Sequence, residues 1–195
     1  DDAAVAFREL LAVVNHVDAS AEDVASSSCS FADKLGGNRC HEEACQALLV
    51  GLRRFRGRMG ERVLQRLYLR RALSRVECLE VMEQAIALLH QIGDGAVGSH
   101  NPADDENHRL FFTLAWRAAH ECVRLATTPS RNPDDNNSST TAATTAVNTT
   151  ALQWCAKLYS CALLFAHFAS NEESCKLLRA YARCCGLLRE FPRAI

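Results

Sequence analysis

The sequence has little proline or glycine and no long apolar run, and each shortage narrows the choice of fold. Four prolines and nine glycines occur in 195 residues, and most fall in three clusters rather than inside periodic segments. No apolar run approaches the roughly 20 residues of a membrane-spanning helix, so we expect a soluble chain without a membrane span. Apolar and polar residues never alternate for more than a few positions, which disfavours strands. These absences favour an all-α fold.

The overall composition is that of a folded domain. Hydrophobic residues make up 48% of the chain and charged residues 23%, with a net charge of −1, which is unlike the composition of disordered proteins. The length suits one domain with or without a long insert. Because the sequence starts at Asp1 without a methionine or an apolar leader, we expect a fragment or a processed form of a longer chain.

Apolar residues recur at helical spacing along most of the chain. Asn38 is a candidate N-cap, and Ser74 can cap a new helix because Glu77 follows three residues later. Glycine and proline predict a loop over residues 93–107. The pattern predicts helices over 3–17, from about 20 to 35, and over 40–56, 61–91 with a break near Ser74, and 108–127.

The most regular local pattern lies near the C-terminus. Two amphipathic segments, 151–169 and 172–190, are joined by Ser170 and Asn171. Either joining residue can cap the second helix, and two glutamates follow where the helix dipole favours acids. We therefore predict a long αα-hairpin. The predicted fold is an irregular helical bundle or short α-solenoid of about seven helices that ends in this hairpin.

Residues 129–150 form a low-complexity tract of Asn, Ser, Thr and Ala, which we expect to be disordered. Two helices cannot bury both of their faces alone, so the C-terminal hairpin should dock on residues 1–128. The tract is then an insert within a single domain over 1–195. Asn136, Asn137 and Asn148 begin glycosylation sequons, but such matches arise readily in a tract of this composition.

The ten cysteines bear on the cellular compartment. Cys78, Cys122 and Cys155 each share a helical face with small or apolar residues. Cysteines in such positions behave as small buried hydrophobes and are common in reducing compartments. We therefore expect an intracellular protein, in the cytoplasm, the nucleus or an organelle matrix. The alternative is a secreted or surface-exposed helical glycoprotein that is stabilised by disulfides.

The motifs that resemble a catalytic or metal site lack the context they need. Residues 93–98 match G-x-G-x-x-G literally, but they follow a helical segment where nucleotide binding requires a strand. Cys40, His41 and Cys45 supply too few ligands for structural zinc, which takes four. No pattern marks an activated nucleophile beside an oriented base. We expect no catalytic residue, no metal and no cofactor.

The segment 53–75 carries nine arginines and a single acid, Glu61. It has a charge of +8, so the rest of the chain sums to −9. Arginines recur every four residues and predict a basic stripe on one helix face. The candidate partner-binding residues are Arg54, Arg58, Arg62, Arg66 and Arg70.

Three interpretations of this basic segment remain open. It is a solvated face neutralised by acids of neighbouring helices, a surface for an acidic protein partner, or an RNA-binding ladder of guanidinium groups. The chain has no overall basic excess to attract nucleic acid from a distance, which ranks RNA last. We therefore expect a non-enzymatic protein-protein interaction or scaffold module, a subunit of a larger intracellular assembly. A ribonucleoprotein component is the third possibility, after the secreted glycoprotein. The acids considered for neutralisation are Glu42, Glu43, Glu77, Glu80 and Glu83.

Overall fold

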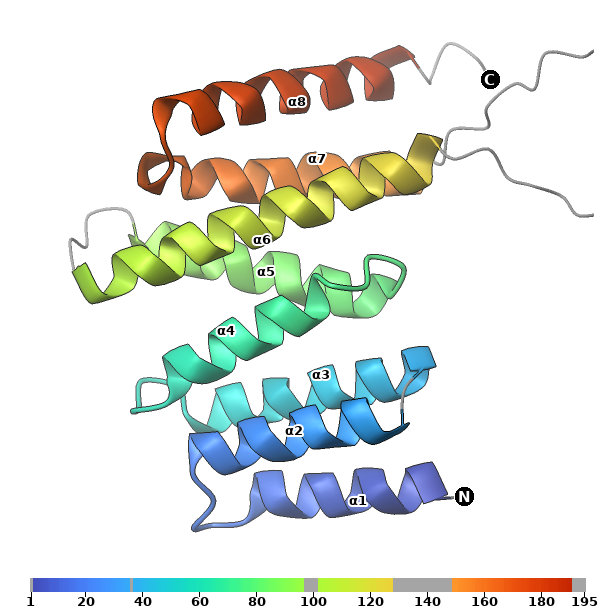
Figure 1. Cartoon of the computed structure of the whole chain (residues 1–195), viewed down its shortest axis with the longest axis vertical. Coiled ribbons are helices and arrows are strands. Elements are labelled where there is room, and N and C mark those ends of the chain that lie inside the picture. Colours follow the sequence, from blue (N-terminus) through green and yellow to red (C-terminus); the bar gives the residue numbers. More distant parts are fainter. Residues whose placement is uncertain (1, 36, 97–101, 128–148, 191–195) are drawn as a thin grey trace, which may run out of the picture. The chain divides into compact units, whose positions relative to one another are not determined.

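The computed structural model describes residues 2–35, 37–96, 102–127 and 149–190 (Figure 1). Every regular element in these ranges is a helix, which confirms the all-α prediction, and there are eight α-helices where about seven were expected. No helix among the described residues is long and apolar enough to cross a membrane. The elements are α1 (Asp2–Asn15), α2 (Ala21–Leu35), α3 (Gly37–Arg54), α4 (Glu61–Ala72), α5 (Leu79–Ala96), α6 (Pro102–Thr127), α7 (Thr149–Leu164), the 3-10 helix η1 (Ala166–Phe168) and α8 (Asn171–Glu190).

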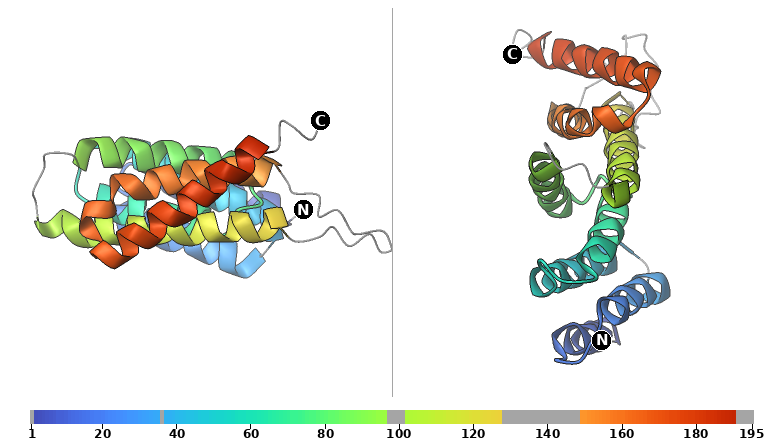
Figure 2. Two further views of the ribbon diagram at one scale, coloured as in Figure 1. Left: turned by 90° about the horizontal axis from the view of Figure 1, so that it is seen from above. Right: turned by 90° about the vertical axis from the view of Figure 1, so that its left-hand side faces the viewer.

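The helices form two compact units, an N-terminal unit over residues 1–89 and a C-terminal unit over 90–195. In the N-terminal unit α1, α2 and α3 pack against one another, and α4 packs on α2 and α3. In the C-terminal unit α7 lies between α6 and α8, as the two further views also show (Figure 2). The single domain expected over 1–195, and the choice between a bundle and a solenoid, concern both units together and stay predictions.

The turn between α3 and α4 depends on two glycines. Gly57 and Gly60 have φ angles of 70° and 94°, a left-handed backbone that glycine adopts without strain. A Cβ atom on Gly60 would also overlap the methyl group of Ala21 in α2. The carboxylate of Glu61 accepts a hydrogen bond of 2.6 Å from the amide of Gly57 and so closes the turn. The gap predicted between the helices over 40–56 and 61–91 is confirmed, because α3 ends at Arg54 and α4 begins at Glu61.

The break near Ser74 is confirmed, but its predicted mechanism is wrong. The hydroxyl of Ser74 donates a 2.7 Å hydrogen bond to the carbonyl oxygen of Arg71 and thereby satisfies the end of α4. The next helix begins only at Leu79. A serine hydroxyl at the end of a helix can donate to the unpaired carbonyl oxygens there. Ser74 makes this bond at the end of α4 and does not cap the start of α5.

The C-terminal αα-hairpin is confirmed, with α7 and α8 joined through η1. Ser170 caps α8: its hydroxyl accepts a hydrogen bond of 3.2 Å from the amide of Glu173. The carboxylate of Glu173 in turn accepts one of 2.9 Å from the amide of Ser170. This reciprocal pair is a capping box, and Ser20 and Asp23 form the same arrangement at the start of α2.

The loop predicted over 93–107 is largely helical. Helix α5 continues to Ala96 and α6 begins at Pro102, where a residue without an N–H suits the first helical turn. Gly93 lies inside a helix because α7 approaches closely: a Cβ atom there would come within 2.7 Å of Leu164. Of the predicted insert at 129–150, the last two residues begin α7, and the rest lies outside the described residues.

Candidate anion-binding pocket

The structure separates the five arginines that were predicted to bind a partner. Arg54 ends α3, Arg58 lies in the turn, and Arg62, Arg66 and Arg70 lie at successive turns of α4. The basic stripe predicted on one helix face is therefore interrupted: only Arg62, Arg66 and Arg70 share a helix, because the turn with its left-handed glycines separates Arg54 and Arg58 from α4. The opposite face of α4 is buried through Leu64, Tyr68, Leu69 and Ala72.

Arg54 has a structural role. Its guanidinium donates hydrogen bonds to the carbonyl oxygens of Val14, Val17 and Ala19, at 2.8, 2.6 and 3.4 Å. These carbonyls lie at the end of α1 and in the segment that follows it, where helix termini leave acceptors unpaired. The guanidinium also lies 5.3 Å from the centre of the Phe55 ring. Arg54 therefore ties the connection between α1 and α2 to the end of α3.

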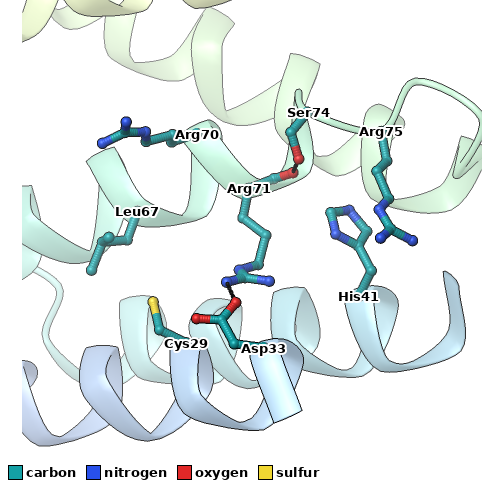
Figure 3. Close-up of a pocket in the computed structure, with 8 residues that line it drawn as sticks. All are labelled: Cys29, Asp33, His41, Leu67, Arg70, Arg71, Ser74 and Arg75. Carbon is teal, nitrogen blue, oxygen red and sulfur yellow. Dashed lines mark hydrogen bonds and ion pairs between the residues drawn. The ribbon is translucent and has the colours of Figure 1, made fainter. Parts of the chain in front are cut away.

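An open pocket of about 450 Å³ lies in the N-terminal unit, among α2, α3, α4 and the connection to α5 (Figure 3). Of the five predicted arginines, only Arg70 lines it. Arg71 and Arg75 belong to the basic segment but do not follow the four-residue spacing of the stripe. They were therefore not among the predicted partner-binding residues. The lining residues are Cys29, Asp33, His41, Leu67, Arg70, Arg71, Ser74 and Arg75.

Arg71 reaches into this pocket from the last turn of α4. Its guanidinium lies 3.5 Å from a carboxylate oxygen of Asp33 in α2. The Arg71 side chain is 20% exposed, whereas that of Asp33 is 75% exposed. Asp33 was not among the acids considered as neutralising partners. One of those acids, Glu43, pairs instead with Arg39 on its own helix at 3.2 Å.

His41 forms the inner wall of the pocket from α3 and is only 4% exposed. Burial lowers the pKa of His41, and the positive charges of Arg75 and Arg71 lower it further. Glu42 and Glu77 oppose this shift less strongly. His41 is therefore neutral near pH 7. Three arginines, Arg70, Arg71 and Arg75, and the carboxylate of Asp33 are among the residues that line the pocket.

The cysteine and histidine considered for zinc do lie together on α3. The Sγ of Cys45 is 3.9 Å from the Nε2 of His41, as expected for residues four positions apart. Burial raises the pKa of the Cys45 thiol to about 12. Within the part of the chain that the structure describes, no three His, Cys, Asp or Glu residues are arranged to hold a metal ion.

A second histidine site lies in the C-terminal unit and was not anticipated from the sequence. The indole N–H of Trp116 donates to the Nε2 of His120 at 3.0 Å. An indole nitrogen can only donate, so this Nε2 carries no proton and the Nδ1–H donates to the hydroxyl of Tyr159, also at 3.0 Å. The bond between His120 and Tyr159 joins α6 to α7, whereas Trp116 orients the His120 ring from within α6. The spacing of four residues between Trp116 and His120 is the part of this arrangement that the sequence could have indicated.

No known family model, curated protein or solved structure matches this chain. We therefore infer the function from the chemistry of the pocket.

Proposed function

We propose that this chain is a non-enzymatic protein-protein interaction module, a subunit of a larger intracellular assembly, and that its basic pocket holds an anionic group of the partner. The observation that carries the proposal is the pocket itself, in which Arg70, Arg71 and Arg75 share an open space with one exposed acid, Asp33. Guanidinium groups donate through a planar fork that suits carboxylate and phosphate oxygens.

A localised pocket favours a protein partner over RNA. The stripe that would follow a nucleic-acid backbone is interrupted, since Arg54 is engaged by backbone carbonyls and Arg58 lies in a separate turn. Backbone binding depends on many phosphate contacts in a row. The net charge of −1 also supplies no long-range attraction for a polyanion.

The buried thiols support the intracellular part of the proposal. Cysteines that occupy core positions behave as small hydrophobes, a usage common in reducing compartments. Cys78, Cys122 and Cys155, which were expected on helix faces that pack inward, are all buried. The buried cysteines are Cys40, Cys45, Cys78, Cys122, Cys155, Cys161 and Cys184.

The state of the thiol beside His41 supports a non-enzymatic role. A cysteine next to a histidine is a nucleophile and base in some enzymes. Here the Cys45 side chain is fully buried, and burial raises its pKa to about 12. Reactive cysteines instead have a lowered pKa and are exposed to solvent. Cys45 is thus suited to packing against α4 and not to attack on a substrate.

The proposal is tested by capturing partners with the intact chain and with charge-matched variants. Tagged wild-type protein, the double variant Arg70→Gln/Arg75→Gln, and the control Arg53→Gln/Arg58→Gln are expressed in the source cells and cross-linked before purification. Both doubles remove two arginines from the same segment, but only the first changes the pocket. We expect the pocket variant to lose most of the wild-type partners and the control to keep them.

Unfolding midpoints of both doubles establish that each is folded before the comparison is made. Equal capture by the wild type and the pocket variant contradicts the proposal, and so does an equal loss in both variants. Partners that disappear after ribonuclease treatment indicate the ribonucleoprotein alternative.

A further inference from the structure

The hydrogen bonds of His120 in the C-terminal unit depend on the protonation state of its ring. The Nε2 atom accepts from the indole N–H of Trp116, and the Nδ1–H donates to the hydroxyl oxygen of Tyr159, both at 3.0 Å. His120 is exposed, so its ring exchanges protons with the solvent. We propose that His120 is a pH-sensitive latch, which holds the indole of Trp116 when neutral and releases it when protonated. This inference does not depend on the basic pocket of the N-terminal unit.

Protonation removes the one hydrogen-bond acceptor of the His120 ring. A neutral imidazole has one donor and one acceptor nitrogen, whereas an imidazolium donates from both. The indole N–H of Trp116 can only donate. Two donors would then face each other across the 3.0 Å that now separates the indole nitrogen from Nε2. The hydrogen bond is therefore lost in acid, and the two rings must move apart.

The contact of His120 with α7 survives protonation. The Nδ1–H is a donor in both states of the ring, and the oxygen of Tyr159 accepts in both. Burial raises the pKa of the Cys155 thiol, and a hydrogen bond from Tyr159 opposes this shift, so the hydroxyl proton is directed toward Cys155. Tyr159 is only 1% exposed and has little room to turn away. Protonation should therefore release Trp116 without separating α6 from α7.

The Trp116 ring has room to move once it is released. Trp116 is half-buried and packs edge-on against the Phe112 ring, with 5.3 Å between the ring centres. Phe112 is only 2% exposed and stays in the core. A released indole can therefore turn toward the solvent while its inner edge stays near Phe112. Because tryptophan is enriched in binding hot spots, the latch controls how much of an aromatic side chain the surface presents.

The other titratable groups around His120 keep their charge between about pH 5 and 7.5. On α6, the hydrogen bond from Arg124 lowers the pKa of Glu121, which stays ionised. Arg117 and Arg124 stay charged, because arginine is not deprotonated in proteins. The 3-10 helix η1 contacts α6 near its start, at His108. On α7 and α8, burial or a neighbouring thiol raises the pKa of the nearby tyrosines and cysteines, which stay neutral. These groups are Tyr159, Cys155, Cys184 and, next to Cys185, Tyr181.

The latch is tested on the intact chain by NMR between about pH 7.5 and 5, the range in which histidine ordinarily changes charge. The titration of the His120 ring is followed together with the solvent exchange of the two indole N–H groups. The exchange rate of Trp116 is divided by that of Trp154, which cancels the intrinsic effect of pH on exchange. We expect this ratio to rise about fivefold in acid, because one hydrogen bond is lost. Its midpoint should coincide with that of the His120 ring.

Two substitutions of His120 fix the latch in its two states. The side-chain carbonyl of His120→Gln can accept from the indole at every pH, so the exchange ratio should stay low. The ammonium of His120→Lys has donors and no acceptor, so the ratio should be high throughout. Unfolding midpoints at both ends of the pH range establish that each protein is folded.

Each remaining outcome contradicts the latch. A constant ratio in the wild type, whether or not the His120 ring titrates, overturns the proposal. A rise of the ratio in His120→Gln at the wild-type midpoint does so too, because another group then releases Trp116. Loss of the NMR contact between the His120 and Tyr159 rings in acid shows that α6 and α7 separate, and overturns a release confined to Trp116.

Discussion

The two units use the same polar residue types in opposite ways. In the N-terminal unit His41, Cys29 and the arginines border an open pocket. In the C-terminal unit His108 is instead enclosed: it is buried, and its ring lies 4.7 Å from that of Phe168 and 5.7 Å from that of Phe165. Both units therefore bury a histidine: His41 lies beside arginines at an opening, whereas His108 lies among aromatic rings.

Burial changes the ionisation of the thiols in the C-terminal unit. Cys122, Cys155 and Cys184 come from three different helices and are close enough to influence one another's ionisation. Burial raises the pKa of all three. The thiol of Cys184 donates a 3.4 Å hydrogen bond to the carbonyl oxygen of Leu152. These cysteines act as packing residues and weak donors, so the residue type alone does not identify a site.

The largest expected effect is a difference in reactivity between accessible and buried thiols. Burial raises the pKa of Cys161 from 9.0 to about 12, which lowers its thiolate fraction near pH 8 about a thousandfold before access is considered. Cys175 is exposed and Cys29 lines the pocket. We expect iodoacetamide to modify Cys175 and Cys29 first in the folded chain, and Cys161 and Cys122 at least about a thousandfold more slowly. Peptide mapping over time measures the rates.

Unfolding the chain without a reductant is the control for this experiment. All ten cysteines should then react, and a much smaller number indicates disulfides and favours the secreted glycoprotein. If Cys122 or Cys161 reacts in the folded chain as fast as Cys175, the core of the C-terminal unit is open and burial does not protect its thiols.

Within the basic segment, Arg54 should matter most for stability. Replacing Arg54 by Met removes its hydrogen bonds to the carbonyl oxygens of Val14 and Val17 and should lower the free energy of unfolding by about 1.5–3 kcal/mol. The control is Arg53→Met at the neighbouring exposed position, for which we expect a change within about 0.5 kcal/mol. Chemical denaturation of both variants gives the two values. Equal losses indicate that the carbonyls find other donors and that Arg54 has no special structural role.

The contrast between Arg54 and Arg70 also shows which features can be predicted from the sequence and which cannot. Helical spacing predicted the all-α fold, and the capping pattern at Ser170 predicted the C-terminal hairpin, because both depend on residues close together in the chain. The role of Arg54 depends on carbonyls 35–40 positions away. A four-residue period therefore grouped Arg54 with Arg70 although their surroundings differ.

The pocket could not be predicted from local sequence patterns either, because its residues are far apart in the chain. Arg71 is opposite Asp33, which lies 38 positions earlier in the chain, and His41 meets Arg75 only after α3 and α4 have packed. Gly93 was read as part of a loop because glycine usually interrupts helices. Its helical position is explained only by the close approach of Leu164, which no local pattern reveals.

The smallest expected effect is the pH dependence that His41 gives to stability. Its folded-state pKa is lowered, first by burial and then by Arg75 and Arg71, while an unfolded histidine titrates near 6.5. As pH falls below about 6.5, the unfolded chain binds a proton at this position before the folded chain does. Stability should therefore fall with decreasing pH. Denaturation of wild type and His41→Gln at several pH values measures the difference.

The difference in the free energy of unfolding between wild type and His41→Gln isolates the contribution of His41, because the other titrating groups are present in both proteins. A constant difference across the range contradicts the lowered pKa. Arg75→Gln should make the dependence shallower, since one of the charges that oppose protonation is removed. An NMR titration of the His41 ring in wild type and in Arg75→Gln checks this directly: the pKa of His41 should be higher in the variant, because Arg75 no longer opposes protonation of the ring.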